Sequence, residues 1–114
     1  MSEKANYGFI LAELELIADR TEFERSAVEN ENFADEVFCI LFDDLRIESF
    51  LASFEFDSKE ELEALSDFVR LAKQIADSMK SHIDGAELVN NDHWKKAQSI
   101  AQDLVELHNR QKGG

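Results

Sequence analysis

Proline is absent from this chain of 114 residues, and glycine occurs only at Gly8, Gly85 and the terminal Gly113-Gly114. These two residue types make most of the sharp turns between the short strands of β-rich folds. A chain with so few of them favours helices joined by short loops. We therefore expect an all-α, four-helix bundle-like single domain over residues 1–114, because this length suits one hydrophobic core.

The clearest helix is predicted over 58–84. Ser58 precedes Glu61 by three residues, the spacing of a capping box in which each side chain bonds the other residue's backbone amide. Gly85 is predicted to end the helix. Apolar residues recur between these ends at intervals of three and four, which places them on one helix face: Leu62, Leu65, Val69, Ala72, Ala76, Met79 and Ile83, with Phe68, Leu71 and Ile75 beside them.

A first helix is predicted over 4–28 by the same periodicity. Thr21 and Glu24 have the spacing of a second capping box, which predicts a break near Arg20 and a shorter helical piece toward Glu29. The apolar residues that keep the helical spacing before this break are Tyr7, Ile10, Leu14 and Ile17, with Leu11 and Ala18 on the flank.

The last helix is predicted over 92–110, capped by Asn91 or Asp92. Basic residues near its carboxyl end suit the helix dipole, and residues 111–114 are expected to form a flexible tail. The face predicted to be buried carries Trp94, Ala97, Ala101, Leu104 and His108.

Residues 33–56 allow two interpretations. As a helix over 33–55, they place Val37, Leu41 and Leu45 on one face, and the apolar residues from Ile47 onward continue it with a slight rotation. As a hairpin over 36–56, the run from Val37 is one strand and the phenylalanine-rich segment is the other, which would make the fold α+β. Leucine and alanine outnumber the β-branched residues here, so the helix is preferred.

The net charge of −13 is concentrated in the first half of the chain. Residues 1–57 carry 15 acidic and four basic residues, whereas residues 58–114 carry ten acidic and eight basic ones. Such a field attracts basic proteins and repels nucleic acid and anionic membranes. We take as candidate partner-binding residues the nine carboxylates within 29–57: Glu29, Glu31, Asp35, Glu36, Asp43, Asp44, Glu48, Glu55 and Asp57.

No motif predicts catalysis, a cofactor or a metal. His82, His93 and His108 lack the spacing of zinc ligands and are interpreted as surface or boundary residues. Cys39 is the only cysteine and follows apolar residues, which favours a buried thiol over a reactive one. We predict a non-enzyme. We expect it to be cytoplasmic, because Glu13 and Glu15 interrupt the apolar run that a signal peptide needs. It is not expected to span a membrane, because no apolar run is long enough to cross a bilayer.

These features favour a small acidic inhibitor of the immunity or antitoxin type, which neutralises a basic toxin such as a nuclease. One alternative is a phage-type nucleic-acid mimic that blocks a defence or DNA-binding protein. The other is a secretion chaperone or structural subunit with an exposed groove at Phe50, Phe54 and Phe56, although core packing is the preferred interpretation of these rings. The oligomeric state stays open, because a dimer seam and a bundle core have the same pattern.

Overall fold

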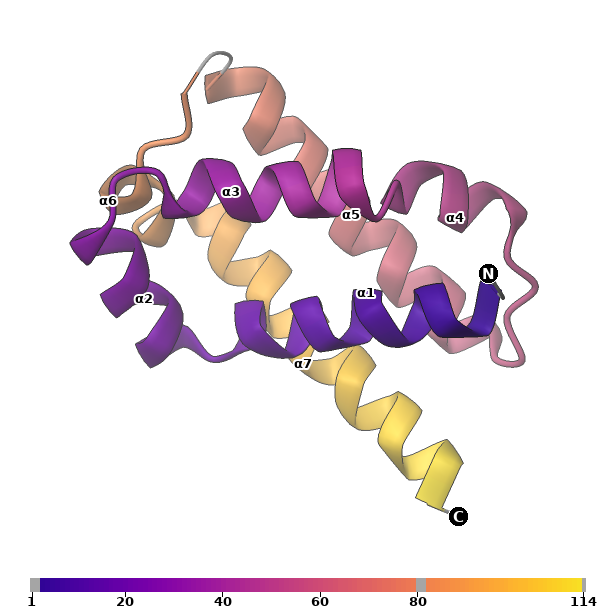
Figure 1. Cartoon of the computed structure of the whole chain (residues 1–114). Helices are drawn as coiled ribbons and strands as arrows, with labels where there is room; N and C mark the ends of the chain where they lie inside the picture. Colours follow the sequence, from indigo (N-terminus) through magenta and orange to yellow (C-terminus); the bar gives the residue numbers. More distant parts are fainter. Residues whose placement is uncertain (1–2, 80–81, 114) are drawn as a thin grey trace.

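The computed structural model describes residues 3–79 and 82–113, and every regular element in those ranges is a helix (Figure 1). The all-α, bundle-like fold class is confirmed, and the alternative hairpin over 36–56 is wrong because helices occupy that region. In chain order the elements are α1 (Glu3–Ala18), α2 (Arg20–Glu29), α3 (Phe33–Cys39), the π-helical turn η1 (Ile40–Asp44), α4 (Ile47–Ser53), α5 (Lys59–Met79), α6 (Gly85–Val89) and α7 (Asp92–Gly113).

The first predicted helix divides at Asp19, next to the expected position. Asp19 leaves the helical conformation, and its side chain accepts a hydrogen bond of 3.2 Å from the backbone amide of Glu22. This satisfies one of the free amides at the start of α2. The cap is therefore Asp19, whereas the sequence predicted Thr21. The break lets α2 turn across the end of the bundle, away from the axis of α1 (Figure 1).

The second predicted helix is divided into α3, η1 and α4. The amide of Leu45 bonds the carbonyl of Ile40 at 2.8 Å, five residues back, and Arg46 adopts a left-handed conformation with φ 49°. A π-helical turn holds one more residue than an α-helical turn, so it rotates the residues that follow it. This explains the slight rotation in the apolar pattern, and both Leu41 and Ile47 are fully buried.

The core is centred on Trp94 of α7, which is fully buried as predicted. Its ring centroid lies 5.3 Å from those of Phe23 and Phe38 and 6.3 Å from that of Phe68, so it joins α2, α3 and α5. The predicted stripe on α5 is displaced, because Leu62 is 36% exposed whereas Phe68 is buried. The buried residues of α5 are Glu61, Leu65, Phe68, Val69, Leu71, Ala72 and Ile75.

Gly85 begins a helix and does not end one, so the predicted helix over 58–84 is wrong at its carboxyl end. α5 ends at Met79, and Asp84 caps the short helix α6 by accepting a 3.0 Å hydrogen bond from the amide of Glu87. A Cβ atom at Gly85 would lie 2.4 Å from the carbonyl oxygen of Ala27. Glycine therefore permits close packing of α6 on α2.

The last helix, α7, extends to Gly113, three residues beyond the predicted end at 110. Its carboxyl end projects beyond the rest of the bundle (Figure 1). No helix in the described part of the chain has the length and apolar character needed to cross a bilayer.

Candidate functional site

The nine predicted carboxylates lie at the end of α2, in the α2–α3 loop, in α3, η1 and α4, and in the segment before α5. Three of them, Asp35, Asp43 and Glu48, make internal contacts, and Asp43 contacts Cys39. Asp35 accepts hydrogen bonds from His82 Nδ1 at 2.6 Å and from the amide of Ile83 at 2.8 Å, and Glu48 pairs with Lys73 Nζ at 2.8 Å. The carboxylates that are exposed and have no such pairing partner in the described structure are Glu29, Glu31, Glu36, Asp44, Glu55 and Asp57.

Cys39 is exposed, so the prediction of a buried thiol is wrong. Val37, Phe38 and Leu41 face the core, and the helical period places Cys39 on the opposite side. Its Sγ lies 3.4 Å from Asp43 Oδ2. The hydrogen bond to Asp43, together with partial desolvation and the negative charges nearby, raises the pKa of the thiol. The thiolate is therefore disfavoured, for a reason other than the apolar burial that the sequence predicted.

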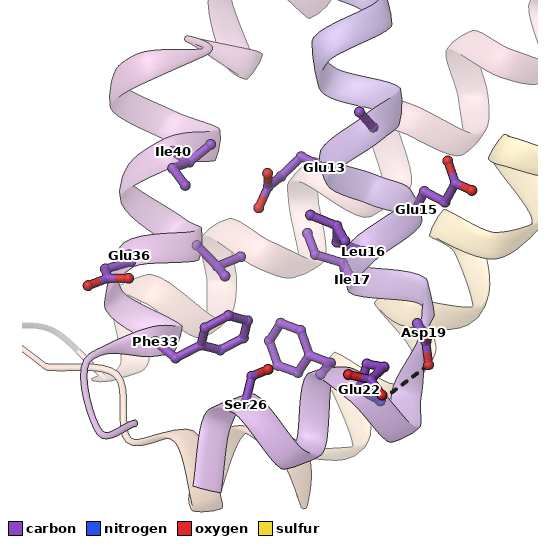
Figure 2. Close-up of a pocket in the computed structure, with 13 residues that line it drawn as sticks. Glu13, Glu15, Leu16, Ile17, Asp19, Glu22, Ser26, Phe33, Glu36 and Ile40 are labelled. Atoms are coloured by element: carbon purple, nitrogen blue, oxygen red, sulfur yellow. Dashed lines mark hydrogen bonds between the residues drawn. The ribbon is translucent and has the colours of Figure 1, made fainter. Parts of the chain in front are cut away.

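A groove of about 740 Å³ opens between α1 and α3, with α2 across one end (Figure 2). Its apolar lining comes from all three helices: Ala12, Leu16, Ile17, Phe23, Phe33, Val37 and Ile40. Its polar lining is one serine and five carboxylates: Ser26, Glu13, Glu15, Asp19, Glu22 and Glu36. Neither lysine nor arginine is among these thirteen lining residues.

Glu13 differs from the other carboxylates of the groove because its side chain points into the space between α1 and α3 (Figure 2). Glu15 and Glu36 lie on the outer sides of these helices, and Glu22 pairs with Arg25. Partial burial raises the pKa of Glu13. Burial removes water that would otherwise stabilise the charged form of this carboxylate. A nearby cation would stabilise that charged form in place of the water.

Three hydrogen bonds fix the corner between α1 and α2 to α7. Gln98, which is buried, donates a 2.9 Å hydrogen bond from Nε2 to the carbonyl of Ile17. The Arg20 guanidinium donates to the carbonyl of Lys95 at 3.1 Å and to Ser99 Oγ at 2.6 Å. The wall formed by α1 and the end formed by α2 are thereby held in place without a ligand.

Of the nine carboxylates predicted as a binding surface, only Glu36 lines the groove. Four other carboxylates that line it were not predicted as binding residues: Glu13, Glu15, Asp19 and Glu22. A signal that could have indicated the groove is Leu16, which lies off the predicted buried face of α1, with Phe9 on the same side of the helix. Phe9 and Leu16 are 57% and 65% exposed.

A second polar cluster lies inside the bundle, around Glu61. This carboxylate is only 3% exposed, and its Oε1 accepts hydrogen bonds from the Tyr7 hydroxyl at 2.9 Å and from His108 Nδ1 at 2.8 Å. The predicted capping box is half formed, because the amide of Glu61 donates to Ser58 Oγ while its carboxylate turns inward. The rings of Phe50, Phe54 and Phe56 pack around Tyr7.

The cluster joins α1, α5 and α7 and so has a structural explanation. The three phenylalanine rings also pack against one another. Phe50 is buried and Phe54 and Phe56 are partly buried, in line with the core interpretation of these rings.

Among the described residues, no group of three or more His, Cys, Asp or Glu side chains is arranged to hold a metal ion. Comparisons with protein-family models, with curated protein sequences and with solved structures find no significant match to this chain.

Proposed function

We propose that this chain is a small acidic inhibitor of the immunity or antitoxin type, which neutralises a toxin by covering a basic surface such as the substrate groove of a nuclease. The observation that carries the proposal is the groove between α1, α2 and α3, which has an apolar floor and carboxylates but no basic side chain in its lining. We assign the chain no catalytic step.

The two properties of this face support different stages of binding. Negative charge in the first half of the chain attracts a basic partner and accelerates encounter, with association rates on the order of 10⁸ M⁻¹s⁻¹ at low salt. Apolar contacts inside the groove then slow dissociation, because they remove hydrophobic surface from water. A nucleic-acid mimic needs only the first property, so the apolar floor favours a protein that recognises one particular partner.

The test is coexpression of this chain with the products of the genes on either side of its own. We expect one product to arrest growth alone and to be tolerated with this chain, and the purified pair to form a complex whose association slows with salt. The proposal is contradicted if no neighbouring product both arrests growth in a way that this chain relieves and forms a salt-sensitive complex with it. Binding to several unrelated DNA-binding proteins would replace it with mimicry.

Charge reversal separates a specific acidic surface from net charge alone. The Asp43→Lys/Asp44→Lys variant should slow association with the neutralised toxin by about tenfold at low salt. Glu48 is left unchanged because it already pairs with Lys73. The control, Glu63→Lys/Asp103→Lys, changes the net charge equally at exposed positions on α5 and α7. Equal association rates for the two variants would exclude η1 as the contact surface.

A further inference from the structure

We propose that the groove between α1, α2 and α3 binds one amphipathic helix of the partner, with its apolar side against the floor and its basic residues along the edges. This inference rests on the proposed function and specifies which segment of the partner makes the contact.

The helix α1 has two apolar faces. Tyr7, Ile10 and Leu14 are turned into the core, whereas Phe9 and Leu16 are exposed on another side. The two exposed residues are seven positions apart, or about two helical turns, so they lie on one side of α1. Leu16 lines the groove, and Phe9 extends the same side toward the amino end of the helix. Grouped exposed apolar residues of this kind mark binding surfaces.

The groove has a shape that suits a bound helix. The helices α1 and α3 form two walls, and α2 crosses one end (Figures 1 and 2). The floor between them includes the buried residues Phe23 and Val37. An apolar cleft between helices accepts the side chains that a bound helix presents at positions i, i+3 or i+4, and i+7. Its volume of about 740 Å³ is sufficient for several such side chains.

The charge of the groove decides the chemistry of its occupant. Glu13 points between the walls, and the outer edges carry Glu15 and Glu36. A basic helix would place lysine or arginine beside these carboxylates, and the cation nearest Glu13 would offset the desolvation that raises its pKa. A second copy of this chain would bring its own carboxylates to the same place and be repelled. The complementarity therefore selects a basic partner.

The test uses a fluorescein-labelled synthetic peptide of about 18 leucine and lysine residues in an amphipathic helical pattern, a length at which a helix is stable enough to bind as one. A peptide with glutamate in place of lysine is its control. Binding is measured by fluorescence anisotropy at near-physiological salt, where weak attraction between distant charges is screened. We expect the basic peptide to bind the intact protein and the acidic one not to bind.

Matched variants locate the peptide. Leu16→Ser should weaken binding by about fivefold, since it removes an apolar contact, whereas Val28→Ser should leave binding unchanged. Leu16 and Val28 are equally exposed, at 65% and 64%, but only Leu16 lines the groove. Glu13→Lys should weaken binding about tenfold more than Glu63→Lys, which makes the same charge change outside the groove. Circular dichroism checks that each variant keeps its helical content.

Equal effects within either matched pair would overturn the proposal, because the peptide would then be held by diffuse charge. A dimer of the unliganded protein that Leu16→Ser dissociates would also overturn it, since a second copy would occupy the groove. If a toxin is neutralised equally well by the Leu16→Ser variant, the groove proposal fails and the proposed function stands. If the peptide binds the groove but no neighbouring product is neutralised, the proposed function fails and the groove proposal stands.

Discussion

Replacing Tyr7 with phenylalanine tests whether the buried cluster at Glu61 stabilises the fold. The substitution removes the hydroxyl that donates to Glu61 at 2.9 Å and keeps the ring that packs on Phe50. A hydrogen bond to a charged acceptor contributes about 1.5–3 kcal/mol to stability. Because Glu61 keeps its bond from His108, we expect the free energy of unfolding to fall by about 2 kcal/mol at pH 7.

The difference in the free energy of unfolding between the natural protein and the Tyr7→Phe variant should vanish at alkaline pH. Burial, and then the hydrogen bond to Glu61, raise the pKa of Tyr7 above its ordinary value of 10.0. Above pH 10 the unfolded chain therefore loses the phenolic proton while the folded chain keeps it, so the stability of the natural protein falls as pH rises. The loss is about 1.36 kcal/mol per pH unit. A difference of about 2 kcal/mol then closes near pH 11.5.

Urea unfolding followed by circular dichroism between pH 7 and pH 11.5 measures this difference in stability. Lysines lose their charge in the same range, but this affects both proteins equally. Tyr7 is the only tyrosine, so phenolate absorbance reports its ionisation alone. A gap that stays constant over this range, or a phenolate signal that develops near pH 10 in the folded protein, would refute the reasoning.

Four further predictions concern single positions. Gly85→Ala should destabilise the protein by about 2 kcal/mol through overpacking against α2, measured by thermal unfolding; Gly8→Ala, where a Cβ meets nothing within 4 Å, should instead stabilise α1 by about 0.5–1 kcal/mol. Asp43→Asn should speed alkylation of Cys39 several-fold at pH 8, since it weakens the hydrogen bond that holds the thiol proton and removes the charge of the carboxylate; an unchanged rate would contradict that cause. Trp94 should emit at short wavelength and resist iodide quenching, whereas easily quenched emission would contradict its burial.

Features that depend on neighbours along the chain were predicted from the sequence. The buried face of α7, the break beside Arg20 and the rotated pattern after Leu45 all arise from helical periodicity or from a local cap. Within one helix, such patterns determine which side chains share a face.

Features that depend on distant neighbours were missed. Glu61 has the local pattern of a capping residue, but Tyr7 and His108, from the two ends of the chain, draw its carboxylate inward. Gly85 has the local pattern of a helix end, yet its small size serves a contact with Ala27. The groove was missed for the same reason, because its walls come from helices whose spacing in three dimensions no periodicity encodes.

The two apolar faces of α1 have a consequence for handling the protein in solution. The outward face, with Phe9 and Leu16, stays in water in the isolated chain, where mutual repulsion between molecules of net charge −13 keeps neighbouring copies apart. Acidification toward the titration range of the carboxylates removes that repulsion while the apolar face stays unchanged. Purified protein should therefore precipitate in mildly acidic buffers. A partner's helix bound along the outward face of α1 should keep the protein in solution.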